Sequence, residues 1–217
     1  IDVSPLAAIE STTSPPGPNK LNTPPSTSIG TNPTVVLNDS LAEPDDIIEC
    51  VATATDSYGG SDSTSASVTV ENRGPTITSV TITSNESGYF NTSTLTCSGV
   101  ANDPDGGTPS FTFNWSHNGI SAGTGVTLAL NKTSYEPGDK IQCEATASDP
   151  HGGTDVATRS KTLQNRPPQI TSVSLNKTTG VLTSDTLTCS ATATDVDGET
   201  PGITYQWRRS RSGTVSN

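Results

Sequence analysis

The segments LTCS (95–98), FTFNW (111–115) and IQCEATA (141–147) each place apolar residues at every second position. Alternation with a period of two is typical of β-strands that bury one face and expose the other. Cys97 and Cys143 both lie on the apolar side of their segments. If these two segments belong to stacked sheets, a disulfide between the cysteines would join the sheets, and the tryptophan of the second segment would pack against it.

The order of Cys97, Trp115 and Cys143 resembles that of the immunoglobulin-like β-sandwich. The resemblance implies two stacked antiparallel sheets, a disulfide between them and a buried tryptophan. Antibody-type domains carry a tyrosine two residues before the second cysteine, and Ile141 stands at that position here. The chain is therefore more similar to the tandem immunoglobulin-like or PKD-like repeats of bacterial and environmental extracellular proteins. This resemblance covers about residues 26–217.

The sequence repeats itself with a period of 92 to 93 residues. DIIECVATATD (46–56) is similar to DKIQCEATASD (139–149), and LTCS (95–98) recurs at residues 187–190. A period of this length is the size of one β-sandwich domain. One unit is complete, whereas the residues on either side of it match only part of a unit.

The repeat predicts an all-β fold of tandem immunoglobulin-like β-sandwiches, with one complete domain and two complementary half-domains. The first half-domain holds Cys50, and the last holds Cys189 and Trp207, so each holds what the other lacks. We predict Trp115 and Trp207 as core residues. The predicted divisions are a Pro/Ser/Thr-rich segment (1–25), the C-terminal half of a domain (26–72), a complete domain (73–165) and the N-terminal half of a domain (166–217).

Three arrangements compete for the half-domains. An excerpt of an uninterrupted repeat array would carry a cysteine near position 4 and a tryptophan near position 22, where Ser4 and Asn22 stand. In the second arrangement the half-domains of neighbouring copies form a composite sandwich, with an intermolecular disulfide between Cys50 and Cys189. In the third, both halves of one chain fold together. Residues 1–25 are either a flexible linker or a donor strand for another subunit.

We favour the second arrangement, because half a sandwich leaves apolar faces and strand edges uncovered. A head-to-tail contact that does not close on itself generates a filament. The predicted function is therefore a structural subunit of an extracellular filament whose partners are other copies of itself. The alternative is a stalk or an adhesion and binding module excerpted from a large cell-surface repeat protein.

Composition narrows the classes of function. Asp and Glu number 22 against 11 Lys and Arg, which disfavours binding to nucleic acid. No apolar run approaches the roughly 18 residues that cross a bilayer, so membrane insertion is not predicted. Four cysteines without a CxxC pair favour disulfides in an oxidising compartment over zinc. The chain contains no GxSxG, HExxH or P-loop pattern, and we predict neither an enzyme nor a cofactor.

Two further patterns recur along the chain. DPDG (103–106) and DVDG (195–198) are typical of tight turns, with Asp103, Asp105, Asp195 and Asp197 as the alternative calcium ligands. The second pattern is the sequon for N-linked glycosylation, in which Ser or Thr follows Asn by two residues. The candidate sites are Asn38, Asn85, Asn91, Asn114, Asn131 and Asn176, and they would make covalent glycans a further partner.

Overall fold

The computed structural model describes residues 26–210 and is all-β, with no helix in that range. The predicted segment 1–25 lies outside the described residues. All strand pairs are antiparallel. The strands are β1 (Ile47–Thr55), β2 (Ser61–Thr69), β3 (Thr76–Ser84), β4 (Thr94–Asn102), β5 (Ser110–His117), β6 (Ile120–Thr124), β7 (Thr127–Ala129), β8 (Lys140–Ser148), β9 (Thr154–Thr162), β10 (Gln169–Leu175) and β11 (Cys189–Thr194).

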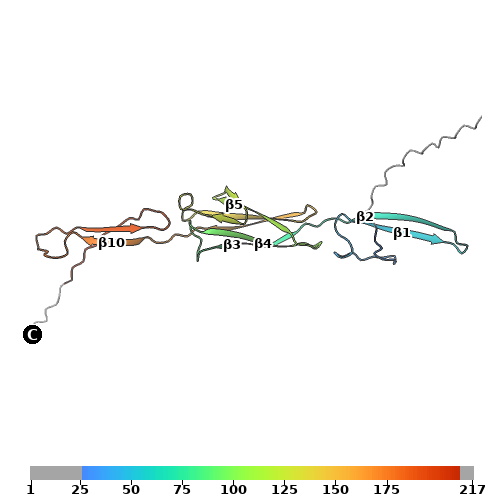
Figure 1. Cartoon of the computed structure of the whole chain (residues 1–217), viewed down its shortest axis with the longest axis horizontal. Helices are drawn as coiled ribbons and strands as arrows, with labels where there is room; N and C mark the ends of the chain where they lie inside the picture. Colours follow the sequence, from blue (N-terminus) through green and yellow to red (C-terminus); the bar gives the residue numbers. More distant parts are fainter. Residues whose placement is uncertain (1–25, 211–217) are drawn as a thin grey trace, which may run out of the picture.

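The strands form three pieces that lie in a row (Figure 1). The middle unit contains two sheets, in the orders β3-β4-β7 and β6-β5-β8-β9. The N-terminal piece contains the hairpin β1–β2, and the C-terminal piece contains the hairpin β10–β11. The two hairpins occupy opposite ends of the molecule and do not pair with each other (Figure 1).

The alternation in the sequence becomes alternation of burial in the middle unit. Along β8, Ile141, Cys143, Ala145 and Ala147 are fully buried, and the residues between them are more exposed. Successive side chains of a strand point to opposite faces, so β8 turns one face toward β4 and the other toward solvent. The predicted strand periodicity is therefore confirmed for this unit.

The disulfide between Cys97 and Cys143 joins the two sheets of the middle unit. Cys97 lies on β4 in the three-stranded sheet, and Cys143 lies on β8 in the four-stranded sheet. Their Cα atoms are 6.4 Å apart, within the usual range for a disulfide. Trp115 lies opposite Cys143 in the pairing of β5 with β8, and its indole N–H donates to the carbonyl of Gly125 at 2.9 Å. The tryptophan is thus buried with its polar atom satisfied.

A local turn explains how β5 and β6 pair. Asn118 and Gly119 connect these strands, with φ angles of 49° and 85°. Two consecutive positive φ angles are the requirement of a type I′ turn, and Asn-Gly is the sequence that adopts it most readily. The Asn118 side chain also accepts a hydrogen bond from the backbone N–H of Lys140 at 2.9 Å. This bond ties the turn to the start of β8.

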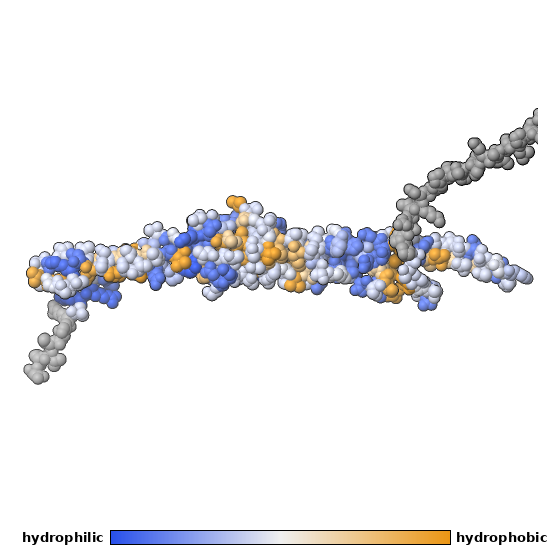
Figure 2. All heavy atoms as spheres, in the orientation of Figure 1, coloured by the Kyte–Doolittle hydropathy of each residue, from blue (hydrophilic) through white to orange (hydrophobic). Residues whose placement is uncertain are grey.

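The hydrophobic core belongs to the middle unit. Among the described residues, the buried hydrophobic side chains other than proline all lie between Ile82 and Leu163. Figure 2 shows hydrophobic residues on the surface of both end pieces as well as of the middle unit. Trp207 was predicted as core and is 57% exposed, whereas Trp115 is 1% exposed. Trp207 is exposed because, within residues 26–210, no second sheet covers it.

We expect the disulfide to contribute strongly to the small core of the middle unit. Replacing both Cys97 and Cys143 by Ala should lower the free energy of unfolding by roughly 2 to 4 kcal/mol. Urea unfolding followed by tryptophan fluorescence measures this loss, because Trp115 moves from the core to water. The matched control is Cys50→Ala, which removes a thiol outside the core cluster. An unchanged midpoint in the double variant would contradict the expectation.

Candidate assembly site

The N-terminal hairpin has the same register as the hairpin β8–β9 of the middle unit. Cys50 lies opposite Ala66 in β1–β2, and Cys143 lies opposite Arg159 in β8–β9. Both members of the second pair follow the first by 93 residues, which is the repeat offset in the sequence. The N-terminal piece therefore contains the counterpart of the last hairpin of the middle unit, and the part of the chain that the structure describes supplies no strands to cover it.

The inner face of this hairpin is open to solvent. Ile48, Cys50, Ala52 and Ala54 correspond to the four fully buried residues of β8. Cys50, Ala52 and Ala54 are exposed, and Ile48 is only half-buried. The same alternating face is thus present in both hairpins, but only the middle unit covers it.

The C-terminal hairpin has the same register as β3–β4. Leu175 lies opposite Cys189, as Ile82 lies opposite Cys97. The irregularity between Ile77 and Ser79 in β3 also recurs, between Ile170 and Ser172 in β10. The C-terminal piece therefore contains the first hairpin of a repeat unit, in the same local geometry.

The aromatic residues after this hairpin are uncovered. Tyr205 and Trp207 correspond to Phe113 and Trp115 at the offset of 92. The first pair is exposed, whereas the second pair is buried in the core of the middle unit. Both end pieces consequently present to solvent the residues that a complete unit buries.

Cys50 and Cys189 are the two free cysteines of the described residues. They occupy the positions of Cys143 and Cys97, which form the disulfide of the middle unit. Cys50 lies in β1 at one end of the molecule, and Cys189 lies in β11 at the other (Figure 1). The structure therefore keeps the two thiols of one chain apart, so a Cys50–Cys189 disulfide in this conformation requires two copies.

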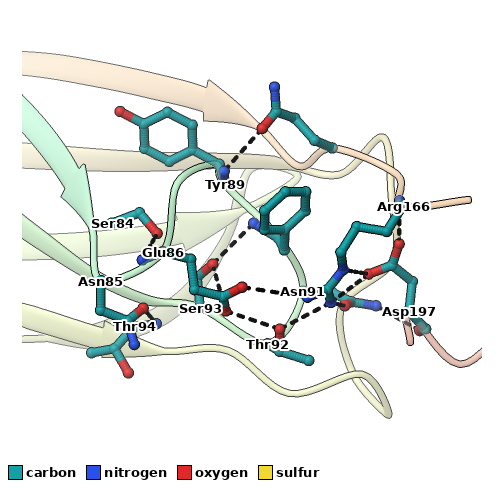
Figure 3. Close-up of polar contacts among 12 residues, drawn as sticks. Ser84, Asn85, Glu86, Tyr89, Asn91, Thr92, Ser93, Thr94, Arg166 and Asp197 are labelled. Atoms are coloured by element: carbon teal, nitrogen blue, oxygen red, sulfur yellow. Dashed lines mark hydrogen bonds and ion pairs between the residues drawn. The ribbon is translucent and has the colours of Figure 1, made fainter.

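An arginine–aspartate pair lies at each boundary between the pieces. At the second junction, Arg166 donates from its backbone N–H and its guanidinium to both carboxylate oxygens of Asp197 (Figure 3). The same guanidinium donates to Thr92 Oγ1 at 3.0 Å and pairs with Glu86 at 3.3 Å. Asn91 donates to the backbone carbonyl of Asp197 at 2.7 Å. The middle unit and the C-terminal piece are thus held by one connected polar cluster.

The first junction repeats the arginine–aspartate pair. Arg73 donates from its backbone N–H and its guanidinium to the carboxylate of Asp105. The backbone N–H of Arg73 is the main cause that holds the pKa of Asp105 below its ordinary value. Arg73 and Arg166 both follow an asparagine at the repeat offset. This recurrence and the recurring DPDG and DVDG segments are the features of the sequence that could have indicated the pair.

These pairs bear on the predicted calcium ligands. Asp105 and Asp197 are bound by arginine, and Asp103 and Asp195 accept the backbone N–H groups of Asp105 and Asp197. The chain forms a turn at residues 104–105 and a bend at residues 196–198. Asp195, Asp197 and Glu199 also bring carboxylate oxygens within 4.8 Å of one another. Burial and the neighbouring Asp195 raise the pKa of Glu199. With Arg166 already balancing the charge of Asp197, this cluster gives no independent support for calcium.

The structure removes one of the glycosylation candidates. Asn91 is fully buried, and its side-chain N–H groups donate to the carbonyls of Tyr135 and Asp197. A glycan on this nitrogen would replace these hydrogen bonds, so the burial of Asn91 argues against glycosylation at this position. The remaining candidates have exposed side chains, and their occupancy stays a prediction: Asn38, Asn85, Asn114, Asn131 and Asn176.

Comparisons of the chain with protein-family models, with curated proteins and with solved structures found no match. Within residues 26–210, no helix is long and apolar enough to cross a membrane.

The two junctions differ in burial, which predicts different sensitivities to mutation. The side chain of Arg166 is 22% exposed, whereas that of Arg73 is 66% exposed. Replacing Arg166 by Ala leaves the carboxylate of Asp197 buried without its charge partner, which typically costs roughly 3 to 5 kcal/mol. We expect the loop at 195–198 to lose most of its protection from hydrogen exchange. Arg73→Ala is the control and should change exchange at 103–106 much less, because exposed pairs contribute only about 0 to 1 kcal/mol. Equal losses at both loops would contradict this expectation.

Proposed function

We propose that this chain is a structural subunit of an extracellular filament. In the filament, the C-terminal piece of one copy and the N-terminal piece of the next form one composite sandwich. The observation that carries the proposal is that the inner-face residues of both pieces are exposed or only half-buried. The equivalent residues of the middle unit line its core, and one piece contains the counterpart of β8–β9 while the other contains the counterpart of β3–β4.

We propose an immunoglobulin-like sandwich for the middle unit and for the composite one. Two antiparallel sheets, an intersheet disulfide and a buried tryptophan beside it support this assignment. The fourth strand of the unit, β6, pairs with β5 of the four-stranded sheet. In constant-type immunoglobulin domains the fourth strand joins the other sheet, so this unit departs from that arrangement.

Burial of the exposed side chains supplies the driving force for assembly. Full burial of one large apolar side chain contributes roughly 1.5 to 3 kcal/mol. The exposed apolar side chains of the two pieces include Val35, Leu37, Val173, Leu175, Tyr205 and Trp207. Strand edges are also uncovered, since each end hairpin is a sheet of only two strands. A contact between opposite ends of a subunit repeats head to tail and builds a filament unless the rotation closes a ring.

The composite sandwich also places two thiols for a covalent bond. Cys189 of one copy and Cys50 of the next occupy the positions that form the disulfide of the middle unit. An oxidising extracellular setting would form this bond and lock the filament. The disulfide between Cys97 and Cys143 agrees with such a compartment.

Electrophoresis without reductant, together with negative-stain imaging, tests the proposal. The 217-residue chain should give fibres and a ladder at multiples of 22.3 kDa that collapses on reduction. Cys50→Ser alone and Cys189→Ser alone should each give a monomer band. An equimolar mixture of the two variants should give one dimer band, because only one thiol of each kind remains.

The outcomes separate the proposal from its alternatives. A chain that stays monomeric at all concentrations overturns the filament and favours a stalk in which one polypeptide supplies the missing strands. Disulfide dimers from either single variant alone would show pairing of like thiols and would contradict the head-to-tail arrangement.

A further inference from the structure

The two junctions of the chain share one geometry. At the first, a Cβ on Gly106 would lie 3.4 Å from the side chain of Asp39. At the second, a Cβ on Gly198 would lie 3.4 Å from the side chain of Lys132. Lys132 and Gly198 follow Asp39 and Gly106 at the repeat offsets of 93 and 92. Together with the recurring arginine–aspartate pairs, these contacts indicate that each unit is placed on the next in the same way.

In the middle unit, two aspartates of the hairpin β8–β9 accept hydrogen bonds from residues around the start of β3. Asp149 accepts a hydrogen bond from the side-chain amide of Asn72 at 3.0 Å. Asp155 accepts one from the backbone N–H of Ile77 at 2.7 Å. Asp149 and Asp155 flank the turn between β8 and β9, whereas Asn72 and Ile77 flank the start of β3. β3 and β9 are edge strands of the two different sheets and do not pair with each other. These bonds therefore link the two sheets at this edge.

The N-terminal hairpin carries the same two aspartates. Asp56 and Asp62 correspond to Asp149 and Asp155 at the offset of 93. Oδ1 of Asp56 accepts the N–H groups of Tyr58 and Gly60, as Oδ1 of Asp149 accepts those of the equivalent residues of its own loop. Within the described part of the chain, Oδ2 of Asp56 and the carboxylate of Asp62 accept no hydrogen bond. The acceptors are thus in place without their donors.

The C-terminal hairpin and the residues just before it carry the matching donors. Asn165 and Ile170 correspond to Asn72 and Ile77. The side chain of Asn165 makes no hydrogen bond within residues 26–210. The local backbone is the same in both pieces, because Thr171 donates to the carbonyl of Thr192 at 3.2 Å just as its equivalent in β3 donates to β4 at 3.1 Å. Ile170 therefore presents its N–H as Ile77 does.

We propose that Asp62 and Asp56 of an incoming copy bind Ile170 N–H and the Asn165 side chain of the preceding copy. This inference rests on the proposed function and names the polar contacts of the same interface. Its role is to set the register. The strand β2 is rich in Ser and Thr and is exposed along its length, so apolar burial specifies its position weakly. Two charged acceptors at fixed places hold one alignment, in which Cys50 meets Cys189.

The test measures disulfide-linked assembly of the full chain in a glutathione redox buffer. The measured quantity is the protein concentration at which half of the chains enter the ladder. Asp62→Ala should raise this concentration about tenfold or more, because a hydrogen bond to a charged acceptor is lost. The matched control is Glu49→Ala, which removes the same charge from the outer side of the neighbouring strand and should leave the concentration within about twofold.

A double-mutant cycle tests the second contact. Asp56→Asn retains Oδ1 for its own loop but replaces Oδ2 by an amide that faces the Asn165 amide. Asp56→Asn and Asn165→Ala should each weaken assembly, and the double variant should be no weaker than the stronger single one. Additive losses, or equal behaviour of Asp62→Ala and Glu49→Ala, overturn this inference while leaving the filament intact. An unsubstituted chain that forms no ladder overturns both.

Discussion

A β-sheet with one apolar face is stable in water only when another layer covers that face. The middle unit satisfies this constraint with its own chain, because β4 and β8 face each other and the disulfide between Cys97 and Cys143 holds them together. The end pieces have the same alternating strands, and within the described residues no second sheet covers them. The difference between the units therefore lies in which strands each contains, and not in the quality of their inner faces.

The uncovered faces belong to two different hairpins of the repeat unit. The N-terminal piece has the last hairpin of a unit with Cys50, and the C-terminal piece has the first hairpin with Cys189 and Trp207. A partner for either piece must supply the strands that it lacks. Another copy of the chain supplies them with a cysteine at the matching position, and that is the physical basis of the proposed filament.

The junctions give the row of units a defined geometry. Arg73 and Arg166 each lie at the start of a unit. Each binds the second aspartate of the DPDG or DVDG segment in that same unit. Arg166 also reaches Glu86 and Thr92 in the preceding unit, so it couples the two. A filament needs such defined joints, because a flexible linker would not orient the two ends of a subunit.

The sequence alone determined the strand periodicity, the repeat and the pairing of Cys97 with Cys143 as a candidate disulfide, since local alternation and spacing are readable without the fold. Burial was decided by tertiary structure, because it depends on what covers a residue. Trp115 and Trp207 have equivalent positions in the repeat, yet only the first is buried. Asn91 lies in an ordinary sequon and is buried at a junction formed by residues more than a hundred positions away. The arginine–aspartate pairs were not predicted from the sequence for the same reason. Each arginine is distant from its aspartate in the sequence, and the two become adjacent only after folding.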